Sequence, residues 1–123
     1  MEKNIIESID LCRFGEEEAC RFLRKQKLKI LDRNYSVRGG EIDIIAEDKN
    51  FVIFVEVKTR SDSKHAQPWE NVRYKKRKNI KAAARQYIQH HRLHGHEFRF
   101  DVVSIVLNDA MKPEIEWIRQ AFV

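Results

Sequence analysis

The run 40–45, GEIDII, and the run 54–58, FVEVK, decide the fold of this chain. Both alternate with a period of two, which is typical of strands because successive side chains of a strand point to opposite faces. The polar stretch EDKN at 47–50 lies between them and predicts a hairpin loop. We therefore expect two neighbouring antiparallel strands at the centre of the fold.

Charged side chains interrupt these otherwise apolar strands. Two hairpin registers keep Glu41, Asp43, Glu56 and Lys58 on one face. One register places Asp43 opposite Phe54, and the other places it opposite Glu56, whereas a slip of one residue would separate the charges. The apolar neighbours predict strands that are covered on both sides: Ile42, Ile44, Val55 and Val57 on one face, and Ile45, Val52 and Phe54 on the other.

Three carboxylates on one mostly buried face, those of Glu41, Asp43 and Glu56, would repel one another and lose solvation. Lys58 offsets part of this cost. A divalent cation such as Mg²⁺ offsets more, because it takes oxygen ligands and is often held between carboxylates and phosphates. Lys58 would then orient or deprotonate an attacking water, or stabilise phosphate charge. A structural ion-pair network explains the same pattern, and the spacing alone favours neither interpretation.

The wider chain resembles a known family. Asp43, twelve intervening residues and then Glu56-Val57-Lys58 resemble the core motif of the PD-(D/E)-x-K nuclease superfamily. An ordered set of stretches resembles one member of it, the YraN-like family of uncharacterised bacterial proteins related to archaeal Holliday junction resolvases. The matching stretches are Gly15-Glu16-x-x-Ala19, Arg33-Asn34-Tyr35, GEID at 40–43, FVEVKTR at 54–60 and RFDVV at 99–103. Cys12 and His65-Ala66 depart from the glycine and the Phe-Gly that the family often has there.

The resemblance implies an α/β protein, with a restriction-endonuclease-like mixed sheet flanked by helices on both faces. It implies a deoxyribonuclease that hydrolyses DNA, branched or structured DNA included, with Mg²⁺ or Mn²⁺ that binds weakly without substrate. The implied catalytic residues are Asp43, Glu56, Lys58 and Glu41, and the implied metal ligands are Asp43, Glu56 and Glu16. Related resolvases work as homodimers, so the resemblance also implies a homodimer.

Residues 8–27 predict the first helix, because an apolar stripe recurs at spacings of three and four. The stripe consists of Ile9, Cys12, Glu16, Ala19 and Leu23. The carboxylate of Glu16 in the middle of this stripe is paired with a basic side chain or, as the resemblance implies, with the metal site. Cys12 and Cys20 lie too far apart on one helix for a disulfide, so we expect reduced core thiols in a cytoplasmic protein.

A second helix is predicted from Trp69 or Glu70 to His91, with an apolar inner face. That inner face consists of Val72, Ile80, Ala83, Ala84, Tyr87 and Ile88. Its remaining surface is almost entirely basic, whereas a solvated helix usually mixes signs. We therefore expect these side chains, together with Arg60 before the helix, to bind nucleic-acid phosphates. The basic residues are Arg73, Lys75, Lys76, Arg77, Lys78, Lys81 and Arg85.

The rest of the chain adds supporting elements. Further strands are predicted at 28–37, 98–107 and 115–123, a turn at Gly39-Gly40 and a loop at 59–68. Asp101, in the middle of a strand, is expected to bind a backbone group or Arg99 rather than to act in catalysis. No P-loop lysine follows the glycines, which excludes a P-loop nucleotide site. His90 and His94 lack a third zinc ligand.

The totals limit the remaining alternatives. A length of 123 residues predicts a single domain over 1–123, and no apolar run approaches the about 20 residues of a membrane span. The net charge of +5 is compatible with a polyanionic ligand. Two alternatives to a nuclease stay open: a non-catalytic nucleic-acid-binding protein with the same fold, and a structural or assembly protein whose acidic cluster is only an ion-pair network.

Overall fold

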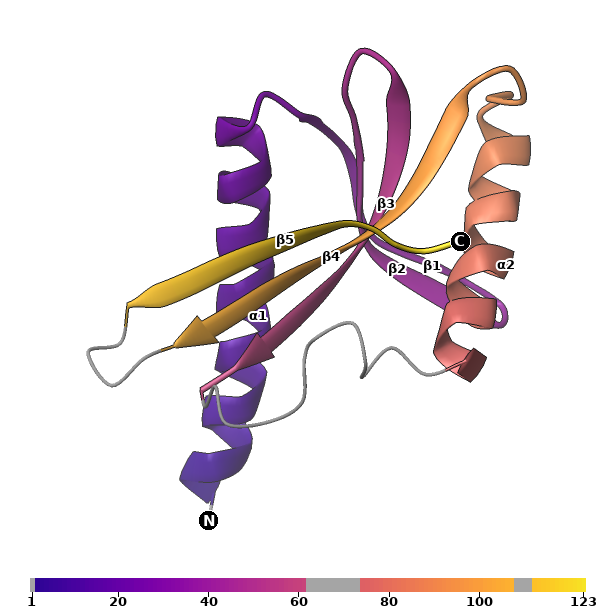
Figure 1. Ribbon diagram of the computed structural model, residues 1–123. Helices are drawn as coiled ribbons and strands as arrows, with labels where there is room; N and C mark the ends of the chain where they lie inside the picture. The colour runs from indigo at the N-terminus through magenta and orange to yellow at the C-terminus, as the bar shows by residue number, and fades with distance from the viewer. Residues whose placement is uncertain (1, 62–73, 108–111) are drawn as a thin grey trace.

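Five strands form one mixed sheet between two helices (Figure 1). The computed structural model describes residues 2–61, 74–107 and 112–123, with the side chains of residues 11–61, 75–107 and 112–123. The elements are α1 (Glu2–Lys25), β1 (Lys29–Val37), β2 (Gly40–Glu47), β3 (Phe51–Arg60), α2 (Tyr74–His90), β4 (Glu97–Leu107) and β5 (Pro113–Phe122). The strands lie in chain order across the sheet. Neighbours are antiparallel except β3 and β4, which are parallel. The predicted α/β class is confirmed, and the mixed sheet is compatible with a restriction-endonuclease-like fold.

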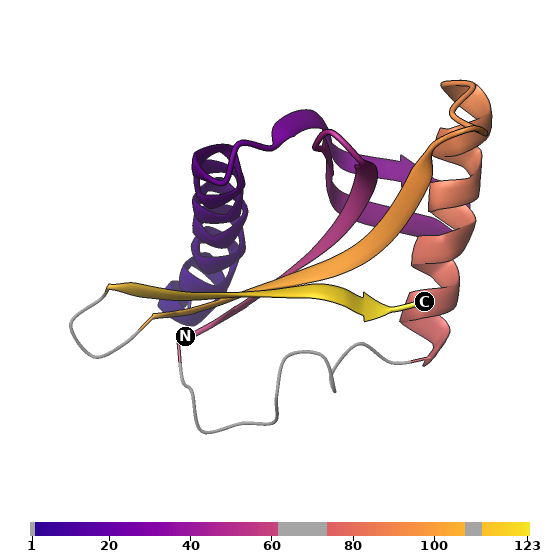
Figure 2. The ribbon, with the colours of Figure 1, turned by 45° about the horizontal axis from the view of Figure 1, so that its top comes forward.

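One helix lies on each face of the twisted sheet (Figure 2), and each face carries its own hydrophobic core. On one face, α2 packs Ile80, Ala83, Ala84 and Tyr87 against Ile42, Ile45, Val52, Phe54, Val102 and Phe122. On the other face, α1 packs Ala19, Cys20 and Leu23 against Leu28, Ile44, Ala46, Ile53, Val55, Val103 and Ile105. Burial on both faces explains why the central strands read as nearly continuous apolar runs, since each buried aliphatic side chain contributes about 1.5–3 kcal/mol.

The hairpin between β2 and β3 adopts the second of the two predicted registers. Its ladder runs from Glu47↔Val52 to Ile44↔Val55, and continuing it by one step brings Asp43 opposite Glu56. Asp48 closes the loop, because its Oδ1 accepts hydrogen bonds from the backbone N–H groups of Asn50 and Phe51, both at 2.8 Å. The predicted polar hairpin loop is therefore confirmed.

The regular alternation of β2 breaks beside Asp43. Ile42 packs in the α2-side core and Ile44 in the α1-side core, so the prediction that they share a face is wrong. The β2–β3 ladder ends at Ile44↔Val55, although both strands continue beyond it. There the carboxylate of Asp43 accepts a hydrogen bond from the backbone N–H of Val57 at 2.8 Å. A side chain thus replaces a backbone partner where the two strands separate.

The first helix begins earlier than predicted, at Glu2 rather than residue 8. Both thiols are free, and Cys20 is buried as expected, but Cys12 is exposed, so its placement in the core is wrong. The N-terminal end of α1 projects past the ends of the strands (Figure 1). Within the residues described, neither helix is long and apolar enough to cross a membrane.

Two glycines allow close packing around β2. Gly39 has a φ of 95°, which confirms the predicted tight turn between β1 and β2. A Cβ added at Gly40 would overlap the backbone carbonyl oxygen of Asn79, so a side chain there would push α2 off the sheet. Close approach at Gly40 therefore fixes the start of α2 against β2.

Two further boundaries differ from the prediction. Thr59 and Arg60 do not begin a loop, because they extend β3 and pair with Ile105 and Val106 of β4. The helix α2 is described from Tyr74, and residues 62–73, with the rest of the expected loop, Val72 and Arg73, lie outside the described residues.

Candidate functional site

The gap between β2 and β3 brings together two carboxylates from the predicted site. Asp43 is half-buried, and the side chain of Glu56 is only 6% exposed. The two carboxyl groups interact directly, through their charges and through a side-chain hydrogen bond. The sequence predicted this neighbourhood correctly, because both residues lie at the step where the hairpin ladder would next pair them.

Burial and the charge of Glu56 raise the pKa of Asp43 from its ordinary value of 3.8 to about 7. The Val57 N–H opposes this shift, since it stabilises the ionised carboxylate, while Glu16 and the hydrogen bond to Glu56 add to it. Near neutral pH the pair therefore holds a proton for part of the time. A cation placed between the carboxylates would stabilise the ionised form of both, and the shared proton would then be lost.

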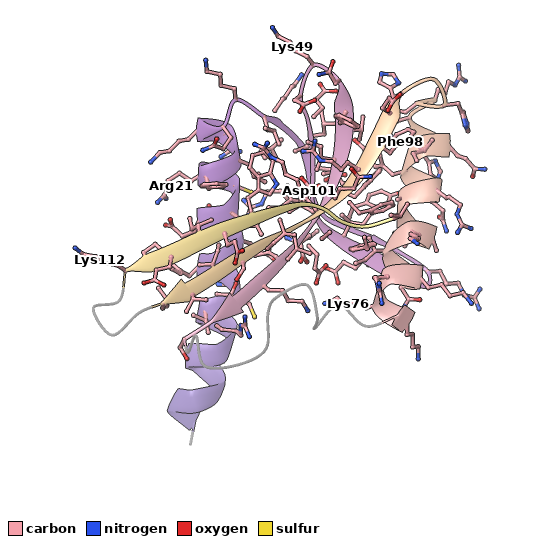
Figure 3. All side chains as sticks on the ribbon, in the orientation of Figure 1. Arg21, Lys49, Lys76, Phe98, Asp101 and Lys112 are labelled. Atoms are coloured by element: carbon pink, nitrogen blue, oxygen red, sulfur yellow. The ribbon has the colours of Figure 1, made fainter. Side chains whose placement is uncertain are left out.

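Two lysines share one oxygen of Glu56. The Nζ atom of Lys58 lies 3.9 Å from Oε1, and the Nζ atom of Lys76 forms a closer ion pair with the same atom. Figure 3 shows the Lys76 side chain extending from the beginning of α2 toward the strands. The acidic pair is therefore reached from α2 as well as from β3.

The environments of these two lysines shift their pKa values in opposite directions. Burial and the neighbouring Lys76 lower the pKa of Lys58, and the attraction of Glu56 and Asp43 does not compensate. Burial also disfavours the charged form of Lys76, but the ion pair with Glu56 outweighs it, so the pKa of Lys76 is raised. Lys58 is thus the lysine that loses its proton more readily.

The position of Lys76 is the main feature that the sequence interpretation missed. We predicted it only as one of several phosphate-binding residues of α2. A signal was available, because Lys76 precedes Ile80, Ala83, Ala84 and Tyr87 at helical spacings of four, seven, eight and eleven, on the face that packs against the sheet. Its contact with phosphate stays a prediction.

The two other carboxylates of the predicted site, those of Glu16 and Glu41, lie in different environments. Glu16 is half-buried on α1 and lies near enough to Asp43 to raise its pKa. Glu41 is exposed, and it is not among the groups that shift Asp43. Gly40 and Ile42 face α2, so Glu41 points to the other side of β2. The prediction that Glu41 shares the buried face is therefore wrong, and Asp43, Glu56 and Glu16 make the acidic neighbourhood.

The carboxylate oxygens of Asp43 and Glu56 suit a hard divalent cation that keeps part of its hydration shell. Across residues 2–61, 74–107 and 112–123, no three His, Cys, Asp or Glu side chains are grouped closely enough to hold a metal ion. Asp43, Glu56 and Glu16, which all lie among the described residues, therefore do not form a preformed three-ligand metal site. Two adjacent carboxylates remain, and Mg²⁺ is commonly held by one or two carboxylates together with water and substrate phosphate.

The predicted phosphate-binding residues lie on α2 and at the end of β3. Lys75 and Lys78 are exposed, and Arg77, Lys81 and Arg60 are half-buried. Arg73 falls outside the described residues. The basic residues of α2 thus flank Lys76 along the helix, and whether they and Arg60 bind nucleic acid stays a prediction.

Asp101 has a structural role, as the sequence predicted. Its fully buried carboxylate accepts hydrogen bonds from Nε and Nη2 of Arg99 at 2.9 and 3.1 Å, and from Nε1 of Trp117 at 2.8 Å. It also accepts a hydrogen bond from the backbone N–H of Gln120 at 2.9 Å. These partners satisfy the charge and connect β4 to the edge strand β5 (Figure 3).

Comparison with known proteins places the chain in a family. The model of the uncharacterised protein family UPF0102 matches residues 15–105. The chain belongs to this family. A UPF0102 protein of Clostridioides difficile strain 630 is 43% identical over 109 residues, which cover 89% of this chain and 93% of that protein. One of Rhodococcus opacus strain B4 is 38% identical over 108 residues, covering 88% and 92%. Membership confirms the resemblance to the YraN-like family.

Proposed function

We propose that this UPF0102 protein is a divalent-cation-dependent endonuclease that hydrolyses phosphodiester bonds in DNA, with branched or structured DNA among its substrates. One observation carries the proposal, namely the buried pair of Asp43 and Glu56 with Lys58 beside it, in the gap between β2 and β3. Two buried carboxylates are costly to keep together unless a cation compensates them. The basic helix beside them suits a polyanion.

Each residue of the site has a distinct role in this proposal. Asp43 and Glu56 would hold Mg²⁺ or Mn²⁺, and Glu16 would orient water around the ion, whereas Glu41 points away from this site. The bound ion supplies Lewis-acid stabilisation of the charge that develops on the scissile phosphate. Arg60 and the basic residues of α2 would contact the phosphates on either side, which gives affinity without base specificity.

Lys58 is proposed to accept the proton of the attacking water. Because burial is the largest cause that lowers the pKa of Lys58, its neutral amine is available at a lower pH than that of an ordinary lysine. The water oxygen attacks phosphorus, its proton passes to Nζ of Lys58, and the bond from phosphorus to the leaving sugar oxygen breaks as that oxygen takes a proton from a second water molecule, which solvent supplies. The protonated lysine then lies beside the negatively charged product phosphate.

The test compares cleavage and binding in one set of proteins. End-labelled four-way junctions and linear duplexes are incubated with Mg²⁺ and the native chain, Lys58→Ala or the control Lys49→Ala, whose lysine is exposed in the hairpin loop. We expect Lys58→Ala to lose about 100-fold or more in cleavage rate, the usual size of a general-base effect, with DNA binding unchanged. Unchanged cleavage would reject the role of Lys58.

The same assay separates the alternatives. If the native chain binds DNA in a salt-sensitive manner but cuts none of the substrates, the protein is a non-catalytic nucleic-acid binder. If it neither binds nor cuts, the acidic cluster is an ion-pair network in a structural protein.

A further inference from the structure

The ion pair of Lys76 occupies a particular oxygen of the proposed site. Oε1 of Glu56 contacts both Lys76 and Lys58, and the Glu56 side chain is 6% exposed, while that of Lys76 is 46% exposed. The ammonium group therefore enters from the surface and neutralises a buried carboxylate. In the free protein Lys76 supplies the positive charge that the carboxylate pair needs.

A divalent cation at the same carboxylates would be incompatible with this ion pair. It would compete for the lone pairs of Glu56, and it would repel an ammonium group held within a few ångströms in a poorly solvated environment. Lys58, anchored on β3 and more buried at 22% exposure, has less freedom to leave. Lys76 is half-exposed at the beginning of α2, so it is the lysine that can move away.

The surface around Lys76 determines which partner its ammonium group can contact after it leaves Glu56. Its neighbours Lys75, Arg77 and Lys78 form the basic end of α2, which has no acidic residue in its first turn. A lysine has a compact charge on a flexible four-carbon stem, so it can exchange a carboxylate for a phosphate by rotation about its own bonds. A nucleic-acid phosphate on this surface would be the available partner.

We propose that Lys76 is a built-in counter-ion, which occupies Glu56 in the free protein and transfers to a nucleic-acid phosphate when a divalent cation binds. The inference rests on the proposed function, since it takes Asp43 and Glu56 as the cation ligands. The nucleic acid and the metal would therefore each raise the affinity for the other. Nucleic acid draws Lys76 away from Glu56, where it competes with the metal, and the metal frees Lys76 to bind a phosphate. Linkage requires the two effects to be equal in size.

The experiment measures Mn²⁺ affinity by titration calorimetry with and without an uncleavable phosphorothioate duplex. The full-length native chain is compared with Lys76→Met and with the control Lys75→Met, which removes the same charge from the adjacent, exposed position. Without DNA, we expect Lys76→Met to bind Mn²⁺ roughly fivefold more tightly than either of the other proteins, the lower end of typical coupling for a half-exposed pair. DNA should raise the affinity of the native chain roughly fivefold and that of Lys76→Met less than twofold.

Two results would overturn the inference: equal Mn²⁺ affinities in Lys76→Met and Lys75→Met, or the same gain on DNA binding in both. An Asp43→Asn arm separates this failure from that of the proposed function. If Mn²⁺ binding depends on Asp43 but not on Lys76, only the counter-ion role fails. If Mn²⁺ binding is absent, or is the same without the Asp43 carboxylate, the metal site itself fails and the counter-ion role fails with it.

Discussion

The side chain of Asp43 has two roles, one in the structure of the hairpin and one in the proposed chemistry. Its carboxylate accepts the Val57 N–H that β2 no longer pairs through its backbone, and it lies against Glu56. The same atoms therefore hold the end of the hairpin together and create the acidic pair. This arrangement has consequences for stability that can be measured without any substrate.

Stability should depend on pH through Asp43. Because its folded pKa is raised from 3.8 to about 7, the folded protein binds more protons than the unfolded chain between these values. The free energy of unfolding should therefore fall as pH rises across this window, by at most about 4 kcal/mol. Urea unfolding between pH 4 and pH 8, with a chelator present, measures this trend. Asp43→Asn should remove most of it, and an identical pH trend in the variant would contradict the assignment.

Asp101 should be essential for stability. Asp101→Ala would leave the guanidinium of Arg99, whose side chain is 11% exposed, without its carboxylate, and would leave the Trp117 N–H unpaired. Removing one partner of a buried ion pair typically costs about 3–5 kcal/mol. Urea unfolding of Asp101→Ala at pH 7 should show a loss of this size. A loss below about 1 kcal/mol, the level of an exposed pair, would show that the carboxylate is not held as described.

At the scale of elements, the contact of α2 with β2 positions Lys76 for Glu56. The backbone of Asn79 approaches Gly40 too closely for any side chain, and Ile80 and Ala83 continue the contact into the core. The helix therefore depends on a glycine in a neighbouring strand.

Gly40→Ala should destabilise the protein by about 1–3 kcal/mol, the usual cost of forcing an extra group into a packed contact. The matched control is Gly95→Ala, since an added Cβ at Gly95 meets no atom within 4 Å. Thermal unfolding monitored by circular dichroism should show a lower midpoint for Gly40→Ala and one within a few degrees of the native chain for Gly95→Ala. Equal midpoints in the two variants would mean that α2 does not pack this closely on β2.

Local patterns were sufficient for most elements but not for their ends or for one irregularity. Period-two alternation and the EDKN loop predicted the hairpin, because side-chain direction in a strand follows from local geometry. The separate packing of Ile42 and Ile44 could not be predicted, since it depends on where β2 leaves β3. The exposure of Cys12 likewise depends on how α1 packs in the folded protein, which the helical stripe does not encode.

At the scale of the whole molecule, the basic helix α2 lies beside the carboxylates of Asp43 and Glu56, at the point where β2 and β3 separate. The sequence predicted both components, but it did not predict that Lys76 crosses from one to the other. That contact joins residues 20 positions apart in the chain, and it exists only because α2 docks where β2 and β3 separate. Long-range packing of this kind leaves no local pattern except the helical spacing of Lys76 with Ile80.

The charge distribution predicts which face binds DNA. Replacing Lys75, Lys78 and Lys81 together with glutamine should weaken DNA binding and reduce the slope of log affinity against log salt by about 0.9 for each phosphate that the variant no longer neutralises. Fluorescence anisotropy at about 50–300 mM salt, chosen to span the usual salt-sensitive range, measures the slope. The control replaces Arg21, Arg24 and Lys25, exposed on α1, with glutamine. Equal slopes in the two triple variants would contradict binding through α2.

The most direct test of the central claim, that Asp43 and Glu56 form a divalent-cation site, is a Mn²⁺ titration by calorimetry with an uncleavable duplex bound. The native chain is compared with Asp43→Asn and with Glu114→Gln, which removes a carboxylate from an exposed position on β5. We predict saturable Mn²⁺ binding in the native chain and in Glu114→Gln, and a loss of tenfold or more, about 1.4 kcal/mol, in Asp43→Asn. Equal Mn²⁺ affinity in all three proteins, or no binding in any of them, would contradict the claim.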